Sequence, residues 1–261
     1  MAQRAGTRRR VVAFRPIRVT KSQAEELARI NRRALKPWED ARERIVEAYA
    51  AELARVIQTD SIDDLAQLFE DIAEMVQAVV LELTPNMRDW ALKVERWHRD
   101  KWRGTVLAGA NVDLQYLIGP AEAQEQISTF LARNTALVRD TTAQAQGRIA
   151  DAVWRGLQSR TPARKVGKEI AEALGMGRKR ANRIAADQAN KLGAALDGQR
   201  QREAGLDVFK YHHSGKLHPR SWHKARDGKY YDRDTGREVV FTGAGQQWGD
   251  DKIADDDMPG V

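Results

Sequence analysis

The chain has 261 residues, 42% of them hydrophobic and 31% charged, which is enough for a domain with a buried core. It contains no cysteine, which excludes disulfides, thiolate zinc sites and a cysteine nucleophile. No apolar run approaches the length of a bilayer span, and the basic N-terminus lacks the apolar segment of a secretory signal, so we expect no membrane association.

The net charge of +7 lies entirely in residues 1–21, which we call the basic arm. The arm has seven basic and no acidic residues, and the rest of the chain is balanced. Such clusters neutralise phosphates and release counterions, so the arm is a candidate contact for double-stranded DNA. An acidic partner surface and a solvated tail are the alternatives. The basic residues are Arg4, Arg8, Arg9, Arg10, Arg15, Arg18 and Lys21.

Helical spacing of apolar residues extends from the arm to about residue 204. Thr20 or Ser22 is predicted to cap the first helix, with Glu25 or Glu26 in its first turn. Asp60 or Ser61 is predicted to cap a second long stretch, whose apolar stripe is continuous. Its members are Leu65, Leu68, Phe69, Ile72, Val76, Val79, Val80 and Leu83.

Two helix interruptions are predicted in the body. Thr84-Pro85 offers a cap and a first-turn proline, so a new helix should begin there. Its apolar face would include the tryptophans Trp90 and Trp97 as core residues. Residues 104–120 are predicted to be an irregular connection.

A second long helical region follows, with an apolar face from Ile127 to Leu157. Gly175-Met176-Gly177 is predicted to be a turn between two helices, the second of which ends at Gly205. Basic residues from Arg178 to Arg183 follow the turn, so a DNA-binding helix-turn-helix is one interpretation and a solvated helix face is the other.

Beyond Gly205 the pattern changes to short strands. Strands are predicted around Val208–Tyr211, Tyr230-Tyr231 and Val239–Phe241, with hairpin turns at Asp227-Gly228 and Asp234–Gly236. The fold class is therefore α+β and predominantly α-helical, with a long helical body followed by a small segment of short antiparallel strands.

Four of the five histidines fall between residues 212 and 223. With Asp227 they could bind a divalent metal, which suggests a metal-dependent nuclease using His218, His223 and Asp227. The alternative is that these histidines form hydrogen bonds across hairpins and pack on Trp222. The spacing matches no strong metal signature, and no phosphate-binding loop or nucleophile elbow occurs. We therefore expect no metal, no cofactor and no enzymatic activity.

Several elements between Asn111 and Gly260 resemble the phage Mu F-like minor head proteins, the phage head morphogenesis family. They include the stretch Asn111–Pro120, an Asn-x-x-Leu element at Asn134, and Arg183–Gln188, which is similar to the family's Arg-x-Ile-Ala-Arg-Asp-Gln. An Ala-Gly turn at Gly205 and an Arg-x-x-His element followed by Gly follow in order. The motif residues are Asn134, Arg183, Asp187, Gln188, Gly205, Arg220, His223 and Gly228.

The resemblance implies a structural protein at the portal vertex of a tailed bacteriophage. It would support head assembly, and DNA passage or ejection, and would be located in the virion head and in the host cytoplasm during assembly. The implied partners are the portal protein, the major capsid or scaffold protein and double-stranded DNA. Family members commonly close with a Cys-Arg-Cys element that is missing here, so a metal site shared with those cysteines would be incomplete.

The organisation predicted from these patterns has five consecutive segments. They are the basic arm 1–21, an N-terminal helical region 22–110, the helical part of the head morphogenesis domain 111–205, its β-containing His-rich part 206–249 and an acidic tail 250–261.

Overall fold

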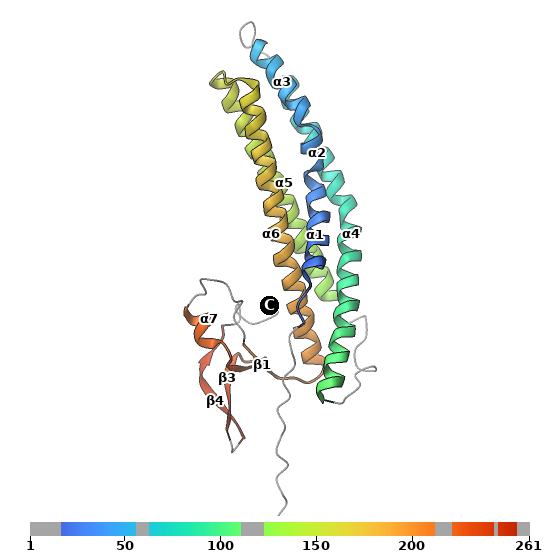
Figure 1. Cartoon of the computed structure of the whole chain (residues 1–261), viewed down its shortest axis with the longest axis vertical. Helices are drawn as coiled ribbons and strands as arrows, with labels where there is room; N and C mark the ends of the chain where they lie inside the picture. The colour runs from blue at the N-terminus through green and yellow to red at the C-terminus, as the bar shows by residue number, and fades with distance from the viewer. Residues whose placement is uncertain (1–16, 56–62, 111–122, 212–220, 243–244, 255–261) are drawn as a thin grey trace, which may run out of the picture. The chain divides into compact units, whose positions relative to one another are not determined.

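The chain forms long helices followed by a small sheet, as the fold class predicts (Figure 1). The computed structural model describes residues 17–55, 63–110, 123–211, 221–242 and 245–254. These residues divide into two compact units. The helical unit comprises residues 18–97 and 124–192, and the sheet unit draws on residues up to 17, 98–123 and 193–261. Both units therefore combine segments that are far apart in the sequence, whereas the sequence predicted consecutive segments.

The helical unit begins with a chain of short helices and continues with long ones. Its elements are α1 (Lys21–Arg32), the 3-10 helix η1 (Arg33–Leu35), α2 (Lys36–Asp40), α3 (Arg42–Arg55), the first part of α4 (Asp63–Ala110), α5 (Gln124–Gln158) and the first part of α6 (Ala163–Glu203). The remaining parts of α4 and α6 belong to the sheet unit.

The start of α1 confirms one of the two predicted caps. The Thr20 hydroxyl accepts from the Gln23 amide at 3.2 Å, and the Gln23 side chain accepts from the Thr20 amide at 2.8 Å. This capping box satisfies two donors that the first helical turn leaves open. The prediction that Glu25 or Glu26 lies in the first turn is wrong, since that turn has no acidic residue. Gln23 supplies the side chain that completes the capping box.

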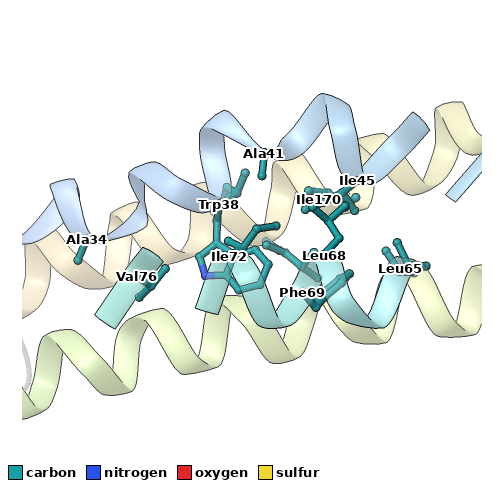
Figure 2. Packing of buried hydrophobic residues seen from close by; sticks show 14 of the residues in the cluster. Ala34, Trp38, Ala41, Ile45, Leu65, Leu68, Phe69, Ile72, Val76 and Ile170 are labelled. Carbon is teal, nitrogen blue, oxygen red and sulfur yellow. The ribbon is translucent and has the colours of Figure 1, made fainter. Parts of the chain in front are cut away.

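The core of the helical unit lies between the short helices, α4, α5 and α6. The predicted stripe of α4 is buried, with the exception of the partly buried Val79. Figure 2 shows Trp38 of α2 directed toward Phe69 and Ile72 of α4, with Ile170 of α6 in the same cluster. The Trp38 and Phe69 ring centroids are 5.5 Å apart. Burial of these large side chains from separate elements is the main stabilising contribution.

The predicted break at Thr84-Pro85 is wrong, because α4 runs through it. Proline removes one backbone donor from a helix. Pro85 is exposed, so the interruption falls on the solvent side, while Leu83 and Met87 are fully buried. The Thr84 hydroxyl donates to the Val80 carbonyl at 3.1 Å. The helix also continues through Gly104 to Ala110, where an irregular connection was expected.

The predicted turn at Gly175–Gly177 is also wrong, because α6 is continuous there. A Cβ at Gly177 would lie 3.1 Å from Leu35 Cδ1 and 3.7 Å from Ala145 Cβ. The glycine therefore permits close packing of α6 against η1 and α5 rather than a change of chain direction. Because the turn is missing, the helix-turn-helix interpretation of the basic residues after it is wrong too.

Four antiparallel strands form the sheet in the order β1-β2-β3-β4. The strands β1 (Val208–Lys210), β2 (Tyr230–Asp232) and β3 (Arg237–Thr242) confirm the three predicted strands, and α7 (Ser221–Arg226) and β4 (Gly245–Lys252) were not expected. The hairpin predicted at Asp234–Gly236 joins β2 to β3, with Asp232 Oδ1 accepting from the Thr235 amide at 2.8 Å.

The other predicted hairpin is wrong. Asp227-Gly228 connects α7 to β2, and the Gly228 amide donates to the Tyr211 carbonyl at 2.8 Å. Gly228 has a φ of +83°, a conformation that favours glycine. Of the predicted acidic tail, the first residues belong to β4 and the following Ile253 is fully buried, while residues 255–261 lie outside the described residues.

Candidate functional site

The basic arm lies largely outside the described residues. Arg4, Arg8, Arg9, Arg10 and Arg15 all fall before residue 17. The two remaining arm residues, Arg18 and Lys21, are exposed beside the start of α1. Lys21 Nζ lies 3.7 Å from Glu25, but the Lys21 side chain is 91% exposed. Because exposed ion pairs are weak, Lys21 remains available to bind a partner.

The described end of the arm is anchored in the sheet unit. The Ile17 amide donates to Asp197 Oδ2 of α6 at 3.2 Å. The Ile17 side chain packs against the buried pair of Trp102 and Val106, as Leu206 does. This combination of a hydrogen bond and apolar contact holds Ile17 in the sheet unit.

The same aspartate belongs to a buried polar cluster that sequence reasoning missed. His98 of α4 is fully buried, and its Nε2 lies 3.2 Å from Asp197 Oδ1. Its Nδ1 contacts Nη1 of Arg200, whose side chain is 3% exposed. Because a guanidinium only donates, Nδ1 is the acceptor of the Arg200 contact.

The His98 cluster joins two helices rather than meeting a substrate. The ring has no exposed surface, so a substrate cannot reach its nitrogens. A signal was available in the sequence, since Val94, His98 and Trp102 follow one another at i, i+4 and i+8 on the apolar face of α4. A histidine at such a position predicts a buried partner on a neighbouring element.

The motif residues in α5 and α6 have mainly structural positions. Asn134 is fully buried and exchanges amide hydrogen bonds with Asn31 at 3.1 and 3.2 Å. Gln188 is 2% exposed and donates to Asp187 Oδ2 at 3.0 Å. Asp187 itself is exposed and pairs with Lys191, and Arg183 is exposed. The structure therefore does not bring these four residues into one site.

Gly205 terminates α6 and leads into the sheet. It has a φ of +64°, its amide donates to the Arg202 carbonyl at 2.9 Å and the Leu206 amide donates to the Gln201 carbonyl at 2.8 Å. These two bonds form a Schellman motif, which satisfies carbonyls left open by the last turn. Gly205 thus ends the helix as predicted.

The histidine-rich segment is described only in part. Arg220, His212, His213 and His218 lie outside the described residues. His223 of α7 contacts the Tyr211 hydroxyl through Nδ1, and its ring stacks on Trp222. Within the described ranges, no group of three His, Cys, Asp or Glu residues could hold a metal ion.

The basic residues between Arg178 and Arg183 lie on the surface of the helical unit. Arg178 Nη1 is 3.1 Å from Glu39, and Arg180 Nη2 is 2.6 Å from Asp140. These ion pairs to α2 and α5 offset part of the positive charge. The arrangement fits the alternative of a solvated helix face.

A bidentate ion pair joins Arg226 of α7 to the sheet. Arg226 Nε and Nη2 lie 2.8 and 3.0 Å from the two carboxylate oxygens of Asp251, which also accepts from the Tyr231 hydroxyl at 2.8 Å. The Arg226 hydrogen bonds hold the pKa of Asp251 down at about 2. Burial, followed by the Asp251 contact, raises the pKa of Tyr231. The hydrogen bonds among these three side chains hold α7 against the sheet.

None of the helices within the described ranges has the length and apolarity to cross a membrane. In comparisons with protein-family models, curated proteins and solved structures, nothing matches this chain.

Proposed function

We propose that this chain is a non-enzymatic minor head protein of a tailed bacteriophage that acts at the portal vertex. The proposal begins from the order of sequence motifs that resemble the Mu F-like family. The observation that carries it is that five of the seven described motif residues serve the scaffold, while Arg183 and Asp187 are exposed. Asn134 and Gln188 are buried, Gly205 and Gly228 shape chain ends and turns, and His223 contacts Tyr211.

A scaffold role fits motif residues of this kind better than catalysis does. A catalytic set converges on one accessible position, whereas these residues are distributed over α5, α6, α7 and the adjoining turns. The charges of the arm, of which Arg18 and Lys21 are described and exposed, complete the proposal with a contact to packaged DNA or to an acidic face of the portal or scaffold.

Portal association is tested by co-purification with the portal oligomer of the same phage. The full chain should be retained, and a variant with Arg8, Arg9 and Arg10 changed to glutamine reports the contribution of the arm. In procapsids, the protein should be depleted when the portal is missing. Equal amounts in portal-containing and portal-free procapsids would contradict the proposal.

The DNA contact of the arm is tested separately. Binding of the full chain to duplex DNA should weaken steeply with salt, and the arm variant should reduce that slope. An unchanged slope would remove the arm from the proposal. Incubation with plasmid DNA and divalent metals should leave the DNA intact, and cleavage that is lost in His223→Ala would favour the nuclease alternative.

A further inference from the structure

One face of the small sheet combines exposed aromatic rings with cations. Strand register places Tyr230 opposite Val239 and Val239 opposite Trp248. Lys210 lies opposite Tyr230, and Phe241 is two residues beyond Val239. Directly paired residues share a face, and so do residues two apart on a strand. These five side chains therefore form one surface, which we call the aromatic face.

The opposite face of the sheet holds a buried cluster, although its end at Val240 is exposed. Phe209, Tyr211, Tyr231 and Ile253 form its buried cluster. On the aromatic face, by contrast, Phe241 is 41% exposed and Trp248 is 50% exposed, although Val239 between the strands is covered. The sheet core therefore does not account for the two large rings.

Each end of the aromatic face has a cation over a ring. Lys210 Nζ lies 5.6 Å from the centre of the Tyr230 ring, and Arg237 Cζ lies 4.9 Å from the centre of the Trp248 ring. Tyr230 and Phe241 meet edge to face at 5.2 Å. The rings thus follow one another across β2, β3 and β4, with Lys210 at one end and Arg237 at the other, where Asp250 lies two residues beyond Trp248.

We propose that the aromatic face binds single-stranded nucleic acid. Bases stack on exposed aromatic side chains with little dependence on sequence, and neighbouring cations attract the phosphates between them. Phe241 and Trp248 would receive bases, and Lys210 and Arg237 would contact phosphates. An exposed Lys and Arg at the rings complement the negative backbone of a nucleic acid, which favours this occupant over an apolar protein segment.

The residues of this site are different from those of the basic arm, which the proposed function assigns to double-stranded DNA. Duplex DNA keeps its bases stacked inside the helix, so exposed rings add little to its binding, whereas single strands offer unstacked bases. A preference for single strands therefore distinguishes the aromatic face from the arm.

The test measures binding of a fluorescent oligothymidylate of about 16 nucleotides and of a duplex of the same length. All proteins in this test are full chains with Arg8, Arg9 and Arg10 changed to glutamine, so that binding by the arm does not dominate the measured affinity. Trp248→Ala should lower the affinity for the single strand about tenfold or more, and Trp248→Phe should retain most of it. Arg237→Gln should lower the slope of affinity against salt by about 0.7.

Val240→Ala is the matched control, because Val240 is equally exposed but lies on the other side of β3 from Phe241. It should bind like the parent, and circular dichroism should show that all variants fold. No single-strand binding at about 50 mM salt, or equal binding by parent and Trp248→Ala, would overturn the proposal. The proposal would also be overturned if Trp248→Ala kept single-strand binding but lost co-purification with the portal, since the aromatic face would then be a protein contact.

Discussion

Asn31 of α1 and Asn134 of α5 face each other with their side-chain amides antiparallel, so that each donates to and accepts from the other. Both side chains are buried, and Asn134 also lies 3.2 Å from the sulfur of Met87. A buried amide pair contributes less stability than apolar packing but disfavours other registers of the two helices. The pair thus aligns α1 with α5.

Removing one partner of this pair should be more damaging than removing both. Asn134→Ala leaves the buried Asn31 amide without its partner, and we expect a loss of about 1–3 kcal/mol in the free energy of unfolding. Changing both residues to leucine should recover part of that loss. Urea unfolding measures both values. Arg133→Ala, at an exposed neighbouring position, is the control, and an equal loss there would contradict the role of the pair.

Two of the glycines of α6, Gly175 and Gly177, should respond in opposite directions to a larger side chain. No atom lies within 4 Å of a Cβ at Gly175, so Gly175→Ala should stabilise the helix by about 0.5–1 kcal/mol. Gly177→Val would press on Leu35 and should cost about 1–3 kcal/mol. Thermal unfolding compares the two. Destabilisation by Gly175→Ala would indicate the turn that the sequence predicted.

The Arg226–Asp251 pair should make the sheet sensitive to acid. The Asp251 pKa falls from 3.8 to about 2 on folding, so its contribution is complete above pH 3.8 and is lost as the pH falls toward 2. Since the carboxylate is 30% exposed, screening limits that contribution to about 1–2 kcal/mol. Asp251→Asn should be less stable than the parent at neutral pH, and the difference should shrink in acid.

Circular dichroism in urea at several pH values gives this comparison. Tyr231→Phe is the control, because it removes the hydroxyl that donates to Asp251 but leaves both arginine bonds. It should keep most of the acid dependence. A constant difference between Asp251→Asn and the parent from neutral pH to pH 2 would contradict the prediction.

Asp197 should control access to the end of the basic arm. Asp197→Ala removes the acceptor of the Ile17 amide, and the loss of a hydrogen bond to a charged group, about 1.5–3 kcal/mol, should raise local opening at least tenfold. Trypsin should then cleave at Arg18 faster. Asp187→Ala, at an exposed position of the same helix, should cleave like the parent. Unchanged cleavage in Asp197→Ala would show that Ile17 packing alone holds the arm.

Parts of the candidate site were visible in the sequence and parts were not. The charge of the arm and the end of α6 at Gly205 are read from residue type alone, since each depends on a few adjacent residues. The aromatic face was not visible, because Trp248 lies in β4. That strand has two glycines and two aspartates in eight residues, so its pattern does not alternate like a strand. Backbone pairing with β3 makes this segment a strand.

The helical type of the body, its apolar stripes and three of the strands can be predicted from the sequence, because a stripe depends only on spacing along one segment. The tertiary structure decided where helices continue. The helix α4 accommodates Pro85 because this residue faces solvent. The helix α6 contains Gly177 because Leu35 packs where a side chain would otherwise lie. The tertiary structure also brought His98 to Asp197, since contacts between distant segments depend on packing that no local pattern encodes.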